Sequence, residues 1–302
     1  MPYYSRRMKR AIVALAICAL AGGCRSLANR GPVSQSVANC RQLTQQGINA
    51  MERGDWKRAE SLLSRAVQTS ATDADARRNY AETLWRRGAT QDALVHLQEA
   101  RRLAVEDPSL AVRTGELHLA LGQVSMASQL ADEALRLDPR LATAWALRGR
   151  VATANGQHRT ALADYQRSLG YAPEDREVAL LVAETYRQLN EPQRALLALQ
   201  ALADRYSPGE EPQQVLYLQG LALSALGRHD DAAQSLSMAA RRDRPTADIL
   251  CRLAEAELLA GRYAVAQQTL EHALAMDPQY APSRALAARM AVAQRGEQPL
   301  VR

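Results

Sequence analysis

Small and apolar residues recur along the middle of this chain with the spacing of two short amphipathic helices. In residues 142–175 they fall on one face of each predicted helix, and they comprise Trp145, Gly149, Ala152, Ala161, Tyr165 and Leu169. A turn at Gly156 separates the two helices, and Pro173 lies just past the end of the second. This stretch therefore predicts one helix–turn–helix unit.

The same pattern repeats along the chain. The turn position is occupied in succession by Gly54, Gly88, Gly122, Gly156, Asn190, Gly227 and Gly261, in steps of 34 residues except for one step of 37. The fifth residue after each turn is always alanine, at Ala59, Ala93, Ala127, Ala161, Ala195, Ala232 and Ala266. A left-handed turn favours glycine, with asparagine tolerated. A small residue lets two helices approach closely. The spacing therefore predicts seven repeats.

In type and offset these residues resemble the tetratricopeptide repeat (TPR), a 34-residue helix–turn–helix family. The resemblance implies an all-α fold, a right-handed TPR superhelix (α-solenoid) in which each repeat buries its apolar face against its neighbours. We predict repeats at 40–73, 74–107, 108–141, 142–175, 176–209, 213–246 and 247–280, followed by a capping helix and tail at 281–302. Residues 207–212 break the register by three and predict an exposed inter-repeat loop.

The N-terminus has the layout of an export signal. A basic segment is followed by the apolar run Ala11–Ala21, which is too short for a membrane span of about 20 residues. Gly22, Gly23 and Cys24 then resemble a bacterial lipoprotein signal, in which the cysteine is lipidated. An ordinary cleaved signal with an incidental cysteine is the alternative. We expect residues 1–23 to be the signal peptide and 24–39 a flexible tether.

Charge and cysteine content narrow the function classes. The signal contributes four positive residues to the net charge of +6, so the mature chain carries about +2, and no nucleic-acid partner is expected. Cys40 and Cys251 fall in the first and seventh repeats, and we expect two unpaired, partly buried thiols. The five histidines show no metal-ligand spacing, and no phosphate-binding loop is present. We expect no enzyme, no catalytic residue, no metal, no cofactor and no small-molecule substrate.

The family resemblance implies that positions 2, 5, 9 and 12 of each first helix line a concave groove. In repeats six and seven these positions include Tyr217, Leu221, Cys251 and Leu258, which are candidates for contact with a partner's helix or extended peptide. The carboxylates of Asp248 and Glu255 beside them would favour a basic edge on that partner. The alternative is that the last helix folds over these residues.

A second candidate is Trp85 between Arg78 and Arg86, because Trp and Arg often anchor interfaces. Packing of Trp85 against the neighbouring repeat is the alternative. Chaperone-binding members of the family that this chain resembles hold a C-terminal carboxylate with Lys and Asn side chains. The predicted groove positions contain neither residue, so a chaperone partner of that class is not expected.

The lipid signal and the repeats together predict a non-catalytic protein-binding scaffold, anchored in the bacterial envelope and facing the periplasm. The combination resembles lipoproteins that assist type IV pilus secretin assembly and, more distantly, those of outer-membrane protein insertion. A secreted, unlipidated adaptor for export or exopolysaccharide assembly, or a regulator that docks a cell-wall hydrolase, are the competing functions.

Overall fold

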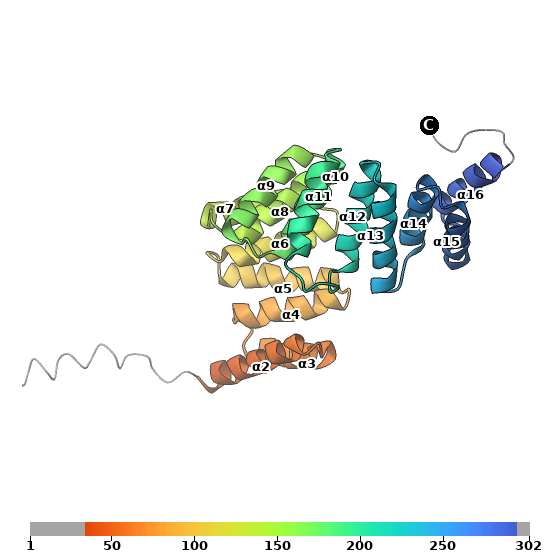
Figure 1. Ribbon diagram of the computed structural model, residues 1–302. Coiled ribbons are helices and arrows are strands. Elements are labelled where there is room, and N and C mark those ends of the chain that lie inside the picture. Colours follow the sequence, from red (N-terminus) through yellow and green to blue (C-terminus); the bar gives the residue numbers. More distant parts are fainter. Residues whose placement is uncertain (1–33, 295–302) are drawn as a thin grey trace, which may run out of the picture. The chain divides into compact units, whose positions relative to one another are not determined.

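The computed structural model describes residues 34–294, and within that range all regular secondary structure is α-helical (Figure 1). The fifteen helices are α2 (Gln35–Glu52), α3 (Trp56–Thr69), α4 (Ala74–Arg86), α5 (Thr90–Leu103), α6 (Pro108–Ala120), α7 (Val124–Leu137), α8 (Ala142–Ala154), α9 (His158–Tyr171), α10 (Arg176–Gln188), α11 (Pro192–Ala203), α12 (Gln213–Ala225), α13 (His229–Arg242), α14 (Ala247–Leu259), α15 (Tyr263–Met276) and α16 (Ala281–Gln294). No helix in residues 34–294 combines the length and apolar character needed to cross a membrane.

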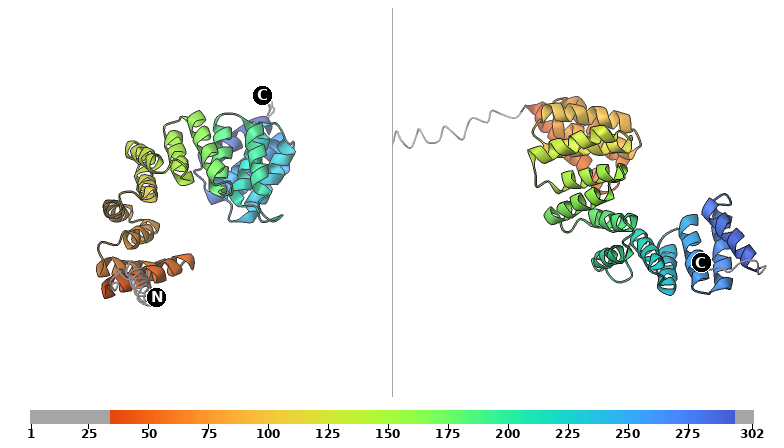
Figure 2. Two further views of the ribbon diagram at one scale, coloured as in Figure 1. Left: turned by 90° about the vertical axis from the view of Figure 1, so that its left-hand side faces the viewer. Right: turned by 90° about the horizontal axis from the view of Figure 1, so that it is seen from above.

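The helices pack in consecutive pairs, and the described chain divides into two compact units. Unit 1, residues 34–105, holds the pairs α2–α3 and α4–α5. Unit 2, residues 106–294, holds the five pairs from α6–α7 to α14–α15, and α16 packs against both helices of the last pair. Figure 2 shows the paired helices from two further sides. The predicted all-α class of stacked helix pairs is confirmed.

The helices begin close to where the repeats were expected to begin. The first helices of repeats two to seven start at Ala74, Pro108, Ala142, Arg176, Gln213 and Ala247. The first repeat differs, because α2 starts at Gln35 rather than at Cys40. The Ser34 hydroxyl accepts a hydrogen bond from the Val37 amide at 3.4 Å and caps the helix. Residues 35–39, expected to belong to the flexible tether, are therefore helical.

Every expected turn residue adopts the left-handed backbone. The six glycines have φ between 72° and 87°, and Asn190 has φ 58°, as the only non-glycine residue with positive φ in the described part of the chain. In each turn the amide two residues past the first helix bonds back to its last turn, as at Gly156 N to Thr153 O (2.9 Å). The six turn glycines face open space, since a Cβ added at any of them would meet no atom within 4 Å.

The alanine five residues after each turn is buried in every pair. Its exposure is 0% in six repeats and 1% at Ala195. The side chain four residues further along the second helix packs onto the first helix, and the largest example is Tyr165, which is 1% exposed. A small residue is needed where these helices meet, as the sequence spacing indicated.

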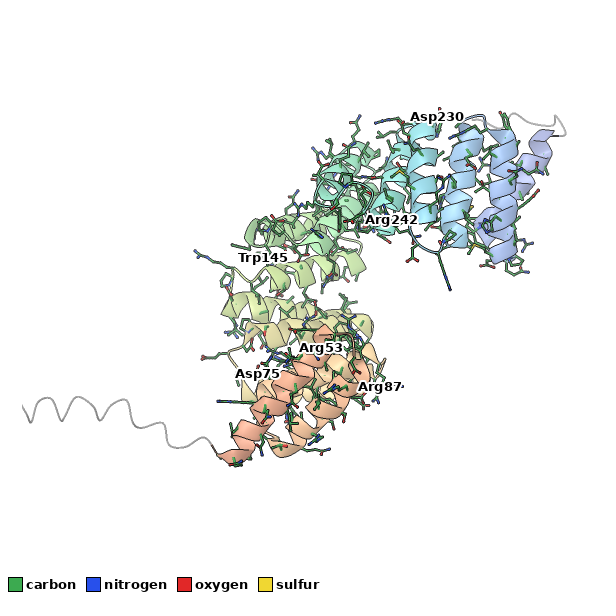
Figure 3. The ribbon with its side chains drawn as sticks, turned by 60° about the horizontal axis from the view of Figure 1, so that its bottom comes forward. Arg53, Asp75, Arg87, Trp145, Asp230 and Arg242 are labelled. Atoms are coloured by element: carbon green, nitrogen blue, oxygen red, sulfur yellow. The ribbon has the colours of Figure 1, made fainter. Side chains whose placement is uncertain are left out.

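Trp145, labelled in Figure 3, is buried and joins several parts of the fourth pair. Its indole Nε1 donates to the Pro139 carbonyl at 2.8 Å, and the guanidinium carbons of Arg148 and Arg167 lie 4.3 and 4.7 Å from its ring centroid. Arg148 also donates two hydrogen bonds to the buried Asp164 carboxylate, at 2.9 and 2.6 Å. This arrangement fixes α8 against α9 through charge-assisted hydrogen bonds.

The three extra residues after repeat five form an exposed loop, as expected. The α11 helix ends at Ala203, and residues 207–210 are all exposed. The Glu211 carboxylate accepts from the Gly209 amide at 3.1 Å and pairs with Arg242 of α13 at 3.1 Å, and Arg242 is labelled in Figure 3. The loop is therefore tied to the following pair.

Candidate functional site

The first helices of unit 2 present a line of partly exposed side chains. We define the first-helix row as positions 2 and 9 of α6, α8, α10, α12 and α14, which are Ser109, Glu116, Thr143, Arg150, Glu177, Glu184, Gln214, Leu221, Asp248 and Glu255. All ten keep some exposure to solvent. Both positions are therefore accessible to solvent in all five first helices of unit 2.

Position 5, also expected to face a partner, behaves differently, whereas position 12 keeps some exposure in every first helix of unit 2 except at Leu258. Val112 in position 5 is 3% exposed and clusters with Ala144 and Leu147 of α8. Ala146 and Cys251, in the same position, are buried as well. The reason is geometric, because this position faces the next first helix and not solvent. At position 5, only Leu180 and Tyr217 in unit 2 remain half-buried.

Ion pairs join the row in its first three helices. Glu116 accepts from Arg113 at 2.9 Å and from Arg150 of α8 at 3.0 Å. Arg150 also reaches Glu177 of α10 at 2.5 Å. Glu184 pairs with Arg187 through two bonds, at 2.9 and 2.6 Å. The carboxylates here are already neutralised by arginines of the same chain.

A carboxylate holds the last helices together. Tyr217 of α12 donates to Asp248 Oδ2, and Tyr280, just before α16, donates to Oδ1 at 2.6 Å. Arg252 Nε lies 3.6 Å from Oδ1. Burial and the bond to Asp248 raise the pKa of Tyr217, and the same causes raise the pKa of Tyr280 to about 12. Both phenols therefore remain proton donors at neutral pH.

The last helix covers two of the expected partner-binding residues. Cys251 and Leu258 are each 3% exposed and share a cluster with Leu286 and Met290 of α16. Arg289 of α16 adds an ion pair to Glu255 at 3.4 Å. The last helix therefore folds over these two residues, which was the alternative to partner binding. A partner reaches Cys251 and Leu258 only if α16 moves. Their role in partner binding stays a prediction.

The remaining candidates of repeat six lie together and keep some exposure. Tyr217 and Leu221 of α12 and Leu180 of α10 are half-buried around one cluster, which includes Ala183 and Leu218. We call Leu180, Tyr217 and Leu221 the apolar floor. The structure thus brings Tyr217 and Leu221 together and adds Leu180, which the sequence placed at position 5 without singling it out.

The unit 1 candidates are partly engaged within the chain. Trp85 is half-buried, Arg78 pairs with Asp75 (labelled in Figure 3) at 3.0 Å, and Arg86 pairs with Glu82 at 3.3 Å. The Arg86 guanidinium lies over a different tryptophan, Trp56, 5.0 Å from its ring. This contact links α4 to α3 and was missed, because nothing in the sequence places Trp56 beside Arg86. Partner binding by Trp85 stays a prediction.

Other chemical features of the described residues are few. Cys40 and Cys251 are free and buried, as expected, and burial raises the pKa of both thiols. Residues 34–294 contain no cluster of three or more metal-ligating side chains. A cavity of about 490 Å³ opens at the turn of the fifth pair, lined by Asn190, Glu191, Pro192, Gln193, Arg194 and Leu226. The lipid-attachment candidate Cys24 lies outside the described residues.

Comparison with known proteins gives the family. Two family models, both described as tetratricopeptide repeat, match residues 50–111 and residues 147–211 and 217–294. Together they cover more than half of the chain, and the chain belongs to the TPR family. TPR domains bind protein or peptide partners and are typically non-catalytic, so this chain is a protein-binding scaffold, and the matching models identify no catalytic domain.

Solved structures show the same fold at low identity. A TPR protein from Parabacteroides merdae is 15% identical with a TM-score of 0.59, over 82% of this chain and 97% of that one. YrrB, described as a TPR protein with an unusual peptide-binding site, is 19% identical with a TM-score of 0.54, over 64% and 97%. PilF from Pseudomonas aeruginosa is 14% identical with a TM-score of 0.51, over 84% and 98%. No curated protein sequence matches the chain significantly.

Proposed function

We propose that this protein is a non-catalytic scaffold of the bacterial envelope, held to a membrane by a lipid on Cys24, which binds partner proteins along the first-helix row. The observation that carries partner binding is the row itself, a line of solvent-reachable side chains that shares Leu221 with the half-buried apolar floor. Peptide binding by YrrB supports the same use of a TPR surface here. The role assigned to the scaffold is assembly of an envelope complex of the pilus or secretion type.

The anchor is supported by the sequence before the described residues. A basic start, an apolar run of eleven residues and a small-residue pair lead directly to Cys24. A single acyl chain binds membranes weakly, so a lipidated scaffold stays at the membrane through a second acyl chain or through its partner.

The experiment is site-specific photo-crosslinking in intact envelopes. A benzoylphenylalanine at Gln214, exposed in the first-helix row on α12, is compared with one at Gln234, exposed on α13 outside the row. We expect the Gln214 position to trap a defined partner protein and the Gln234 position to trap none. Equal trapping at both positions, or none at Gln214, would overturn the row as the binding surface.

The anchor is tested separately with Cys24→Ala. Radiolabelled palmitate should enter the wild type and not the variant, and the variant should move to the soluble periplasmic fraction. No label in the wild type would favour the secreted, unlipidated adaptor. Recovery of a cell-wall hydrolase as the only trapped partner would favour the regulator of that enzyme.

A further inference from the structure

The chemistry of the partner can be inferred from how the first-helix row is neutralised. The apolar floor of Leu180, Tyr217 and Leu221 lies between α10 and α12. Charged side chains lie on both sides of it, on α6, α8 and α10 in one direction and on α14 and α16 in the other. Whether these charged side chains are already paired within the chain determines which partner fits the floor.

Each carboxylate flanking the floor has an arginine partner in the same chain. Five carboxylates and five guanidiniums take part, at N–O distances from 2.5 to 3.6 Å: Glu116, Glu177, Glu184, Asp248 and Glu255 with Arg113, Arg150, Arg187, Arg252 and Arg289. The flanks are therefore electrically balanced. The expectation that Asp248 and Glu255 attract a basic edge loses its basis, because both carboxylates are already satisfied.

A charged partner would have to replace these internal pairs. Placing a Lys or Glu against a satisfied pair removes its water and leaves one of the three charges without a counterion, which opposes binding. An uncharged apolar side chain meets no such cost over Leu221 and Tyr217, and it removes the exposed part of both from water.

The other exposed apolar side chains of unit 2 do not offer an equivalent surface. The larger ones lie mainly on second helices, such as Met126 on α7, Leu197 on α11 and Met238 on α13. Single apolar residues of this kind are ordinary on protein surfaces. The apolar floor differs because its three members come from two neighbouring first helices and share one cluster.

We propose that the apolar floor recognises an uncharged apolar ridge on a partner segment, and that charge contributes little to this recognition. This inference rests on the proposed partner-binding function of the first-helix row. Its consequence is a binding reaction that is nearly independent of salt, because no counterions are exchanged between the two surfaces.

Three fluorescein-labelled peptides are the probes. Each has about 15 residues and one leucine ridge at helical spacing, and the flanking positions are all Gln, all Lys or all Glu. Fluorescence anisotropy measures their binding to the purified full chain. We expect the Gln peptide to bind most tightly, with a Kd that changes less than about twofold between roughly 0.05 and 0.5 M salt.

Two variants locate the binding. Leu221→Glu should weaken the Gln peptide about tenfold or more, whereas the matched control Leu197→Glu, at a 65% exposed residue on α11, should leave the Kd unchanged. Arg187→Gln removes the partner of Glu184 beside the floor, so it should tighten the Lys peptide several-fold at low salt. Circular dichroism verifies that each variant remains helical.

The inference is overturned if the Lys or Glu peptide binds the wild type more tightly than the Gln peptide with a steep salt dependence. It also fails if Leu221→Glu has no effect or if none of the three peptides binds. These failures are distinct from failure of the proposed function. Partner trapping at Gln214 together with charge-dependent peptide binding would keep the scaffold and reject the uncharged ridge, whereas no trapping at Gln214 rejects the row itself.

Discussion

Replacement of Gly149 by alanine tests how closely the helices of a pair approach. Gly149 lies in α8 opposite Tyr165 of α9, and a Cβ atom there would lie 2.5 Å from Cε1, 2.6 Å from Cδ1 and 3.1 Å from Cζ of the tyrosine ring. The ring is 1% exposed, and its hydroxyl lies 3.0 Å from Thr153 Oγ1, within hydrogen-bonding distance. The tyrosine therefore has little room to move aside.

Two effects of Gly149→Ala oppose each other. In a helix interior alanine is favoured over glycine by about 0.5–1 kcal/mol. Overpacking a core costs about 1–3 kcal/mol, and two contacts near 2.5 Å against a held ring place this site at about 2–3 kcal/mol. We expect a net loss of about 1–2 kcal/mol, which lowers the Tm by roughly 2–8 °C in a unit of this size.

The control is Gly170→Ala in α9, where an added Cβ meets nothing within 4 Å. Only the preference of a helix for alanine over glycine remains at this position, so we expect the stability to rise by about 0.5–1 kcal/mol. Far-UV circular dichroism during urea unfolding measures both variants against the wild type. If Gly149→Ala matched or exceeded the wild type in stability, the close approach inferred from the structure would be refuted.

A double variant separates steric conflict from other causes. Gly149→Ala with Tyr165→Leu recreates the alanine–leucine pair that other repeats use, for example Ala81 with Leu97, where both residues are buried. We expect the two changes together to cost less than the sum of the single changes. Simple additivity would mean that the alanine and the tyrosine ring do not conflict.

Three further predictions concern the pKa values of Glu257 and His96 and the burial of Cys251 beneath α16. Burial raises the pKa of the Glu257 carboxyl, so the folded state binds its proton more readily than the unfolded state. Stability should therefore rise as pH falls from neutral through the raised pKa, and Glu257→Gln should abolish that rise in Tm. Burial and nearby Arg77 lower the pKa of His96, so unit 1 should lose stability as pH falls below about 6.5, and hydrogen exchange in α5 of a His96→Gln variant should lack this loss. Cys251 should resist thiol labelling in the native chain but react in the Leu286→Glu variant, in which α16 is loosened. Mass spectrometry measures the labelling, and equal labelling of the two proteins would contradict the burial of Cys251 beneath α16.

Much of the fold could be predicted from one sequence, because the repeat constrains it locally. A left-handed turn requires glycine or asparagine, and the seven turn positions all have positive φ, including Asn190. Close packing requires a small residue, and the alanine five positions later is buried in every repeat. These requirements involve only neighbouring residues and one helix pair, so they appear directly as sequence periodicity.

The site could be predicted only in part, because the predicted groove positions have different neighbours in different repeats. The sequence assigned Leu221 and Cys251 to the same predicted groove, but Leu221 keeps solvent access and Cys251 lies beneath α16. That difference depends on which helix packs over each residue, and the residue types in the sequence do not indicate it. One usable signal was overlooked: Glu116 and Arg150 are 34 residues apart, one repeat length, and they form an ion pair.

The helix pairs, their turns, the buried alanines and the repeat class can thus be obtained from the sequence alone, since each depends on local backbone and packing rules. The three-dimensional packing of the helices was needed to show which inner positions remain open and which arginine neutralises which carboxylate. It also joined Asp248 to Tyr217 and Tyr280, 31 and 32 residues away in the chain. These features arise where side chains from successive helices meet, and the distances between them are set by packing rather than by their spacing in the sequence.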